Sequence, residues 1–158
     1  MAQIFFILPY LNYAILNWGN STASQCNKLL LLQKKAVRII NKTGYREHTD
    51  PLFAELKVLK FIDLYNLNLG KFMFRYKSGL LPSSFNDLFI LCSSVHTYGT
   101  RSASKGDFYT NYNRTSLFKN SLVSRCILFW NNLKPDLKKS PTLKSFSKNL
   151  KHYLLKMY

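Results

Sequence analysis

The segment from Ser24 to Lys42 constrains the fold of this chain more than any other stretch. When successive residues are turned by 100°, its apolar side chains fall on one half of a helical wheel and its basic side chains on the other. The apolar half holds Leu29, Leu30, Leu32, Ala36, Val37, Ile39 and Ile40, and the basic half holds Lys28, Lys34, Lys35, Arg38 and Lys42. The pattern predicts an amphipathic helix with a wholly basic face, which Gly44 is expected to end.

Four other stretches also favour helices, and three of them, all but residues 117–134, have start or stop signals. The four stretches are residues 50–59, 61–79, 117–134 and 141–158. Asp50 is the expected cap of the helix at 50–59 and Pro51 its first residue, and Asp63 is the expected cap and Gly79 the expected stop of the helix at 61–79. The sequence therefore predicts a mainly α fold, a small helical domain of about five helices.

Residues 93–116 show no helical period and are rich in Ser, Thr, Asn, Gly and Tyr, so they are expected to form a long irregular loop. In this loop basic side chains alternate with aromatic ones: Arg101, Lys105 and Arg114 among Tyr98, Phe108, Tyr109 and Tyr112. Such a mixture can stack bases and hold phosphates. A long loop pinned to the core by its tyrosines has the same composition, and the sequence leaves both interpretations open.

The net charge of +16, from 23 basic and 7 acidic residues, narrows the class of partner. A field of this strength favours polyanions, either nucleic acid or an anionic membrane surface. The charge is concentrated in residues 28–60 and 117–158, where the last helix has Lys144, Lys148 and Lys151 opposite its apolar stripe. The alternative is a lysine-rich surface that is only solvated. Two basic faces and the basic–aromatic loop together favour nucleic acid.

Patterns typical of catalysis are absent from the sequence. It has no Asp-Asp pair, no glycine-rich phosphate loop and no G-x-S-x-G, so no catalytic residue, metal or cofactor is predicted. Cys26, Cys92 and Cys126 are odd in number and lack C-x-x-C spacing, which argues against a disulfide framework and a standard zinc site. Cys92 and His96 alone are too few ligands for a metal. The cysteines fit a reducing, intracellular compartment, the cytoplasm or the nucleus.

The first 19 residues are apolar and resemble the core of a signal peptide. They lack a basic leader, because the first Lys is Lys28, and Pro9 and Asn12 interrupt the run. Spanning a bilayer takes about 20 apolar residues, so no membrane segment is expected. A secreted or membrane-anchored cationic protein is the alternative, supported by the sequons at Asn20, Asn41 and Asn113. A sequence so rich in Asn, Ser and Thr yields sequons by chance.

Four stretches, in order along nearly the whole chain, resemble the reverse transcriptases of non-LTR retrotransposons of the jockey-like and chicken-repeat-like type. The family patterns are PYLxYxxxxWG, LQKKAxRxI, HxYxTRSA and WNxLP…FKxxLK. Their counterparts here are Pro9–Tyr13 with Trp18-Gly19, Leu32–Ile40, His96 with Tyr98 and Thr100–Ala103, and Trp130–Leu133 with Phe146 and Leu150. Lys134 departs from the pattern, since the family usually has Pro there and this chain has Pro one residue later.

The resemblance implies the thumb and C-terminal region of an RNA-directed DNA polymerase, downstream of its catalytic palm. The family's catalytic Asp-Asp motif has no counterpart here, so the chain is expected not to be an enzyme on its own. A thumb docks on the palm and grips a nucleic-acid duplex by its backbone. The expected phosphate-binding residues are Lys28, Lys34, Lys35, Arg38 and Lys42, with Arg101 and Lys105 as a second group.

The expected organisation follows from the same comparison. Residues 1–23 would pack on the missing palm, 24–92 would form a thumb-like helical region, 93–116 the basic and aromatic loop, and 117–158 a C-terminal helical region. The expected partners are the palm of the parent polymerase and RNA, DNA or an RNA–DNA hybrid. A host-retained helical protein with an interaction or structural role, and no nucleic-acid partner, is the alternative.

Overall fold

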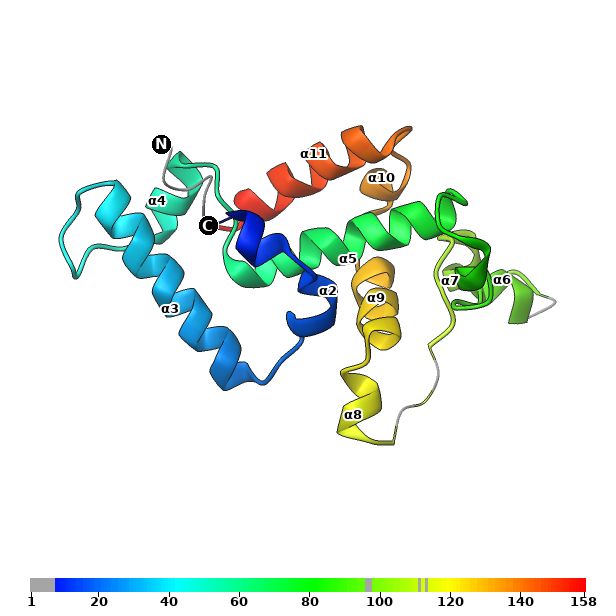
Figure 1. The fold of residues 1–158 in the computed structure, drawn as a ribbon. Coiled ribbons are helices and arrows are strands. Elements are labelled where there is room, and N and C mark those ends of the chain that lie inside the picture. The colour runs from blue at the N-terminus through cyan, green and yellow to red at the C-terminus, as the bar shows by residue number, and fades with distance from the viewer. Residues whose placement is uncertain (1–7, 96–97, 111, 113) are drawn as a thin grey trace. The chain divides into compact units, whose positions relative to one another are not determined.

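The computed structural model describes residues 8–95, 98–110, 112 and 114–158, and these are mainly helical, as predicted (Figure 1). Each of the five predicted helical stretches contains a helix: α3 (Ala23–Ile40), α4 (Asp50–Glu55), α5 (Phe61–Lys77), α9 (Leu122–Asn131) and α11 (Leu143–Leu155). Shorter helices are α2 (Ile15–Trp18), α6 (Cys92–Val95), α7 (Arg101–Ser104), α8 (Ser116–Lys119), α10 (Pro135–Lys138) and a 3-10 turn, Ser83–Phe85. The expected loop at 93–116 is thus interrupted by single helical turns.

The chain divides into two compact units. Unit 1 comprises residues 1–68 and 150–158, and unit 2 comprises residues 69–149. The boundary at residue 68 falls inside α5 and inside the predicted thumb-like region. The division into four functional ranges stays a prediction.

Trp18 and Gly19 pack the N-terminal part of unit 1 against the start of α5. The Trp18 ring stacks on Phe61 with ring centroids 5.3 Å apart, and its indole N–H donates to the Tyr13 carbonyl at 2.6 Å. A Cβ on Gly19 would lie 2.5 Å from the Ile15 carbonyl oxygen and 2.6 Å from the Tyr65 ring, so only glycine fits. Part of the apolar 1–23 segment therefore packs within unit 1, whereas Tyr10 and Tyr13 are exposed.

The start of α5 is held by side chains distant in sequence. The Gln33 Oε1 accepts a hydrogen bond from the Phe61 N–H at 2.6 Å. The Tyr158 hydroxyl accepts from the Lys60 N–H and donates to the Asp63 carboxylate, both at 2.7 Å. Burial, and then the hydrogen bond to Asp63, raise the pKa of Tyr158. Asp63, predicted as the cap of this helix, thus lies in its first turn and bonds a tyrosine.

Unit 2 has an aromatic core. Phe74 and Phe146 stack at 4.8 Å between ring centroids, and Phe108 contacts the rings of Tyr76 and Phe89. Asn131 fixes the chain at Phe108: its Oδ1 accepts from the Phe108 N–H at 2.9 Å and its Nδ2 donates to the Phe108 carbonyl at 2.8 Å. These contacts attach the 93–116 segment to α9.

A buried ion pair fixes the same segment a second time. The Lys138 ammonium lies 2.8 Å from the Asp107 carboxylate, and both side chains are largely shielded from solvent. The Asp107 carbonyl also accepts from the Cys92 N–H at 3.0 Å. Asp107 and Phe108 thus attach the loop to unit 2 through an ion pair, hydrogen bonds and ring contacts.

Four helices, α3, α4, α5 and α7, end in a turn in which a residue after the helix adopts a left-handed conformation. Gly79 does so after α5, as predicted, with φ of 64°. After α3 the left-handed residue is Lys42, with φ of 52°, so the prediction that Gly44 ends this helix is wrong. The helix closes two residues earlier because the Lys42 and Thr43 N–H groups already satisfy the Ile39 and Arg38 carbonyls.

Candidate nucleic-acid interface

The α3 basic face, defined as Lys28, Lys34, Lys35, Arg38 and Lys42, is built by helical spacing. Lys28 and Lys35 are seven residues apart, so they lie on one side of the helix, whereas Lys42 follows the helix end in a left-handed conformation; all three are exposed. Lys34 is half-buried. Within the described residues none of these four lysines forms an ion pair, and α3 contains no acidic residue. Their charges are therefore open to an external anion.

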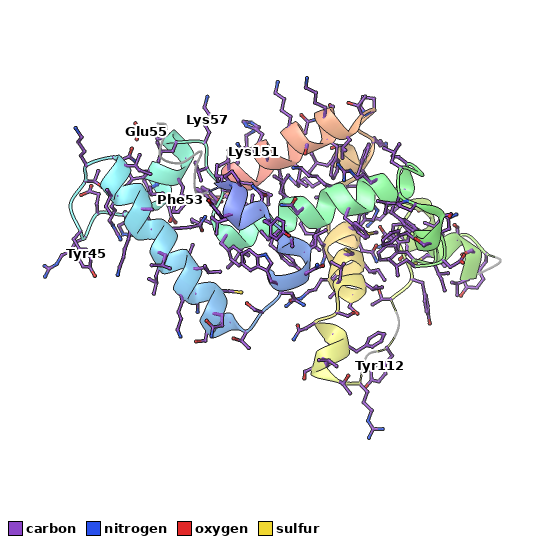
Figure 2. All side chains as sticks on the ribbon, viewed as in Figure 1. Tyr45, Phe53, Glu55, Lys57, Tyr112 and Lys151 are labelled. Carbon is purple, nitrogen blue, oxygen red and sulfur yellow. The ribbon has the colours of Figure 1, made fainter. Side chains whose placement is uncertain are left out.

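Arg38 differs from the lysines because its guanidinium is already used. Its Nε and Nη2 donate to the Glu47 carbonyl at 3.0 and 2.9 Å, and its Cζ lies 6.0 Å from the centre of the Tyr45 ring. Tyr45 projects from the connection between α3 and α4 (Figure 2). Arg38 thus holds the turn after α3. Of its five N–H donors two are occupied, so a phosphate contact would use the others.

The second predicted group, Arg101 and Lys105, lies at α7. Thr100 caps this single turn by accepting from the Ala103 N–H at 3.1 Å. Arg101 and Lys105 are four residues apart and both are exposed, so the turn presents two cations on one side.

The aromatic residues near α7 divide into two kinds. Tyr98 is exposed, and Tyr112 is 94% exposed and projects into solvent (Figure 2). Phe108, which the sequence grouped with them as a possible base-stacking side chain, is 2% exposed and belongs to the core of unit 2. The prediction for Phe108 is wrong because its ring packs on Tyr76 and Phe89.

A further basic row, left out of the predicted site, lies on α11. Lys144, Lys148 and Lys151 are exposed at intervals of four and three residues, and α11 has no acidic residue. In the sequence these lysines form the polar half of an amphipathic pattern. A basic half is also typical of a helix face that is only solvated, so periodicity alone did not identify these lysines as a binding site.

The described residues offer no place for a metal. No three His, Cys, Asp or Glu side chains gather in that part of the chain. His96, one half of the Cys92 and His96 pair, lies outside the described residues. Burial raises the pKa of the Cys126 thiol to about 12 and also raises the pKa of Cys92, where Asp107 adds to the effect. Neither thiol is activated as a nucleophile.

Comparisons with protein-family models, curated proteins and solved structures find no match. Among the described helices none is long and apolar enough to cross a membrane. The functional argument therefore depends on the residues of this chain.

Most of the motifs behind the resemblance have a packing role in this structure. Trp18 and Gly19 close unit 1, Thr100 caps α7, and Asn131 holds Phe108. The stretch Leu32–Ile40 combines packing with the half-buried Lys34 and the exposed Lys35, neither of which forms an ion pair within the described residues. The geometry thus makes the α3 basic face the leading candidate interface.

Proposed function

We propose that the chain is a nucleic-acid-binding fragment derived from the thumb and C-terminal region of a non-LTR reverse transcriptase. One observation carries the proposal: α3 and α11 hold seven basic residues and no acidic ones, and the lysines at positions 28, 35, 144, 148 and 151 are exposed.

Lysines of like charge on one helix lower its stability, and a surface that is only solvated could avoid this by mixing acidic residues among them. Lysines three or four residues apart on a helix repel one another, whereas a Glu in their place would stabilise the helix by about 0.2–0.5 kcal/mol per pair. Lys144, Lys148 and Lys151 have this spacing without an acidic residue in the helix. A bound polyanion removes the repulsion, which is why rows of unpaired lysines support a phosphate-binding role.

The mechanism is neutralisation of phosphates. Lysines act as point charges on the backbone, so they give affinity and position but little choice of base sequence. Lys28, Lys35 and Lys42 would contact phosphates along one strand, and Arg38 would keep the turn after α3 in place. No catalytic step is assigned to these residues, because they are lysines and an arginine, and none is a carboxylate that could bind a metal.

The test is fluorescence anisotropy with a labelled RNA–DNA duplex between about 50 and 200 mM salt. The variant is Lys28→Glu/Lys35→Glu, chosen in preference to a change at Arg38 because both lysines are exposed and hold no internal contact among the described residues. The control is Lys119→Glu/Lys139→Glu, which changes the net charge equally at two other exposed positions.

We expect the wild-type affinity to fall steeply with salt, by orders of magnitude if several phosphates are bound. Removing two contacts should lower the slope of log affinity against log salt by about two. The control should bind nearly as well as the wild type. Equal losses in both variants would mean that total charge, and not the α3 basic face, determines binding. No binding of folded protein at low salt would contradict the proposed function itself.

A further inference from the structure

The apolar half of α3 is only partly covered. Val37 is buried, but Leu32 is 60% and Ile39 73% exposed. A helix whose whole apolar half belonged to the core would bury these side chains. Among the residues of unit 1 that the structure describes, the neighbours of this helix therefore leave part of its apolar surface uncovered.

Beside this surface lies an apolar groove. The α3 groove lies among apolar side chains of three parts of unit 1: Leu29, Leu32, Ala36, Val37 and Ile40 of α3, Leu8 and Leu11 before α2, and Phe53 of α4 with Val58 after it. Phe53 points from α4 into the interior (Figure 2). The groove encloses about 220 Å³, more than the cavity of about 150 Å³ that holds a benzene ring.

The one polar residue lining the groove does not need a ligand. The Gln33 Oε1 accepts a hydrogen bond from the Phe61 N–H at 2.6 Å, and the Gln33 Nε2 donates to the Leu59 carbonyl at 3.5 Å. The groove is therefore a site for apolar side chains, and its specificity must come from its edge.

The edge is basic. Lys28 precedes Leu32 by four residues and Lys35 follows it by three, so both lie next to it on the helix, and both are exposed. No acidic residue of α3 offsets them. A second copy of this chain would bring another +16 of charge, so repulsion disfavours self-association through this edge.

From the apolar groove and its lysine edge we propose that unit 1 binds an acidic amphipathic helix of a partner protein. Apolar residues at i, i+3 or i+4, and i+7 of that helix occupy the groove, and its Asp or Glu residues pair with Lys28 and Lys35. This inference does not depend on nucleic-acid binding, although the two lysines are shared and the two ligands would compete for them.

The test uses a labelled, designed 16-residue helix with Leu at i, i+4 and i+7 and Glu on the flanking positions. A second peptide has Lys in place of each Glu. Two protein variants form a matched pair: Leu32→Gln and Leu31→Gln. The two leucines are neighbours of nearly equal exposure, 60% and 58%, but only Leu32 lines the groove. Neither substitution creates a buried polar group, so both variants are expected to fold.

The wild-type protein should bind the acidic peptide, and its affinity for the basic peptide should be at least tenfold lower. The Leu32→Gln substitution should lower the affinity for the acidic peptide at least tenfold, whereas Leu31→Gln should leave that affinity unchanged. Equal behaviour of the two variants, or of the two peptides, would overturn the proposal. Two further results would also overturn it. One is a wild-type dimer in sedimentation that the Leu32→Gln substitution dissociates. The other is binding to anionic vesicles that Leu32→Gln abolishes, in a protein that does not bind the peptide; in either case another occupant would fill the groove. Because the probe is a peptide, failure here leaves the duplex result unaffected.

Discussion

Lys42 and Lys57 have backbone conformations that lysine adopts at a cost. Their φ angles are 52° and 53°, in the left-handed region, where a Cβ crowds the following carbonyl. Each follows a helix end: the Lys57 and Val58 N–H groups donate to the Ala54 and Phe53 carbonyls, as Gly79 and Leu80 do after α5. Gly106 and Asp107 make the same pair of hydrogen bonds after α7, so this turn uses glycine in two places and lysine in two.

We expect Lys57→Gly to stabilise the protein by about 0.5–1 kcal/mol, because glycine meets no Cβ penalty at positive φ. The measurement is the free energy of unfolding from urea denaturation. The control is Lys151→Gly in α11, also exposed (Figure 2), which should lose about 1 kcal/mol as glycine does inside a helix. A loss in both variants would mean that Lys57 makes a stabilising contact that outweighs its strain.

The buried thiol of Cys126 makes stability fall at alkaline pH. Burial raises its pKa from 9.0 to about 12, so the unfolded chain releases this proton first and binds fewer protons than the folded chain between these values. Stability therefore decreases as pH rises above about 9. We expect Cys126 to account for a loss of about 2 kcal/mol between pH 8 and 10.5.

Urea denaturation of wild type and Cys126→Ala at both pH values tests this expectation. The alanine variant should be less stable at pH 8, because it leaves a small cavity, but should lose less stability on going to pH 10.5. Parallel losses in the two proteins would show that the thiol ionises in the folded state as readily as in the unfolded one.

Single residues also show what the sequence could not reveal. Arg38 falls on the basic half of its helix, and nothing in the spacing indicates that its guanidinium turns to the Glu47 carbonyl. Phe108 and Tyr112 are four residues apart in one aromatic-rich stretch, yet one is core and the other solvent-exposed. The Asp107–Lys138 pair joins residues 31 apart. Such contacts depend on tertiary packing, which local composition does not contain.

At the scale of elements, periodicity located the helices well, because 3.6-residue repeats of apolar side chains depend only on the helix itself. It did not indicate how far an apolar half would be covered. The polar and apolar halves of α3 and α11 read alike in sequence, but Phe146, Leu150 and Leu154 of α11 are buried while Leu32 and Ile39 of α3 are exposed. Whether the apolar half of a helix is buried depends on the elements packed against it, so the α3 groove could not be predicted from periodicity.

The lysine row of α11 gives a test in which stability and binding change in opposite directions. Lys148→Glu places an acidic residue between Lys144 and Lys151 and should stabilise the helix by a few tenths of a kcal/mol, roughly, through i, i+3 and i, i+4 pairs. The same change should weaken duplex binding. Thermal melts and anisotropy measure the two effects.

The matched control is Lys139→Glu, which alters the net charge equally at an exposed position after α10. It should not gain stability from helical pairing. If Lys148→Glu stabilises the protein and leaves binding unchanged, the α11 row is solvated surface and the nucleic-acid contact lies elsewhere.

For the whole molecule, net charge is the dominant physical property. Both units are basic: unit 1 has ten basic and four acidic residues, and unit 2 has thirteen and three. Ion pairs join Lys60 to Asp50 and Lys138 to Asp107, but seven acidic residues cannot neutralise 23 basic ones. Most positive charges therefore repel one another across a surface that folding makes compact, which lowers the stability of the folded state.

Salt should act on this protein in two opposite directions. Between about 20 and 500 mM NaCl the screening length falls well below 10 Å, so self-repulsion weakens and the melting temperature should rise. Duplex affinity should fall over the same range, because counterion release becomes less favourable. The Lys119→Glu/Lys139→Glu variant, with a net charge lowered by four, should show a smaller rise in melting temperature. A melting temperature that falls with salt would mean that attractive pairs outweigh the repulsion, and the charge argument for a polyanion partner would lose its basis.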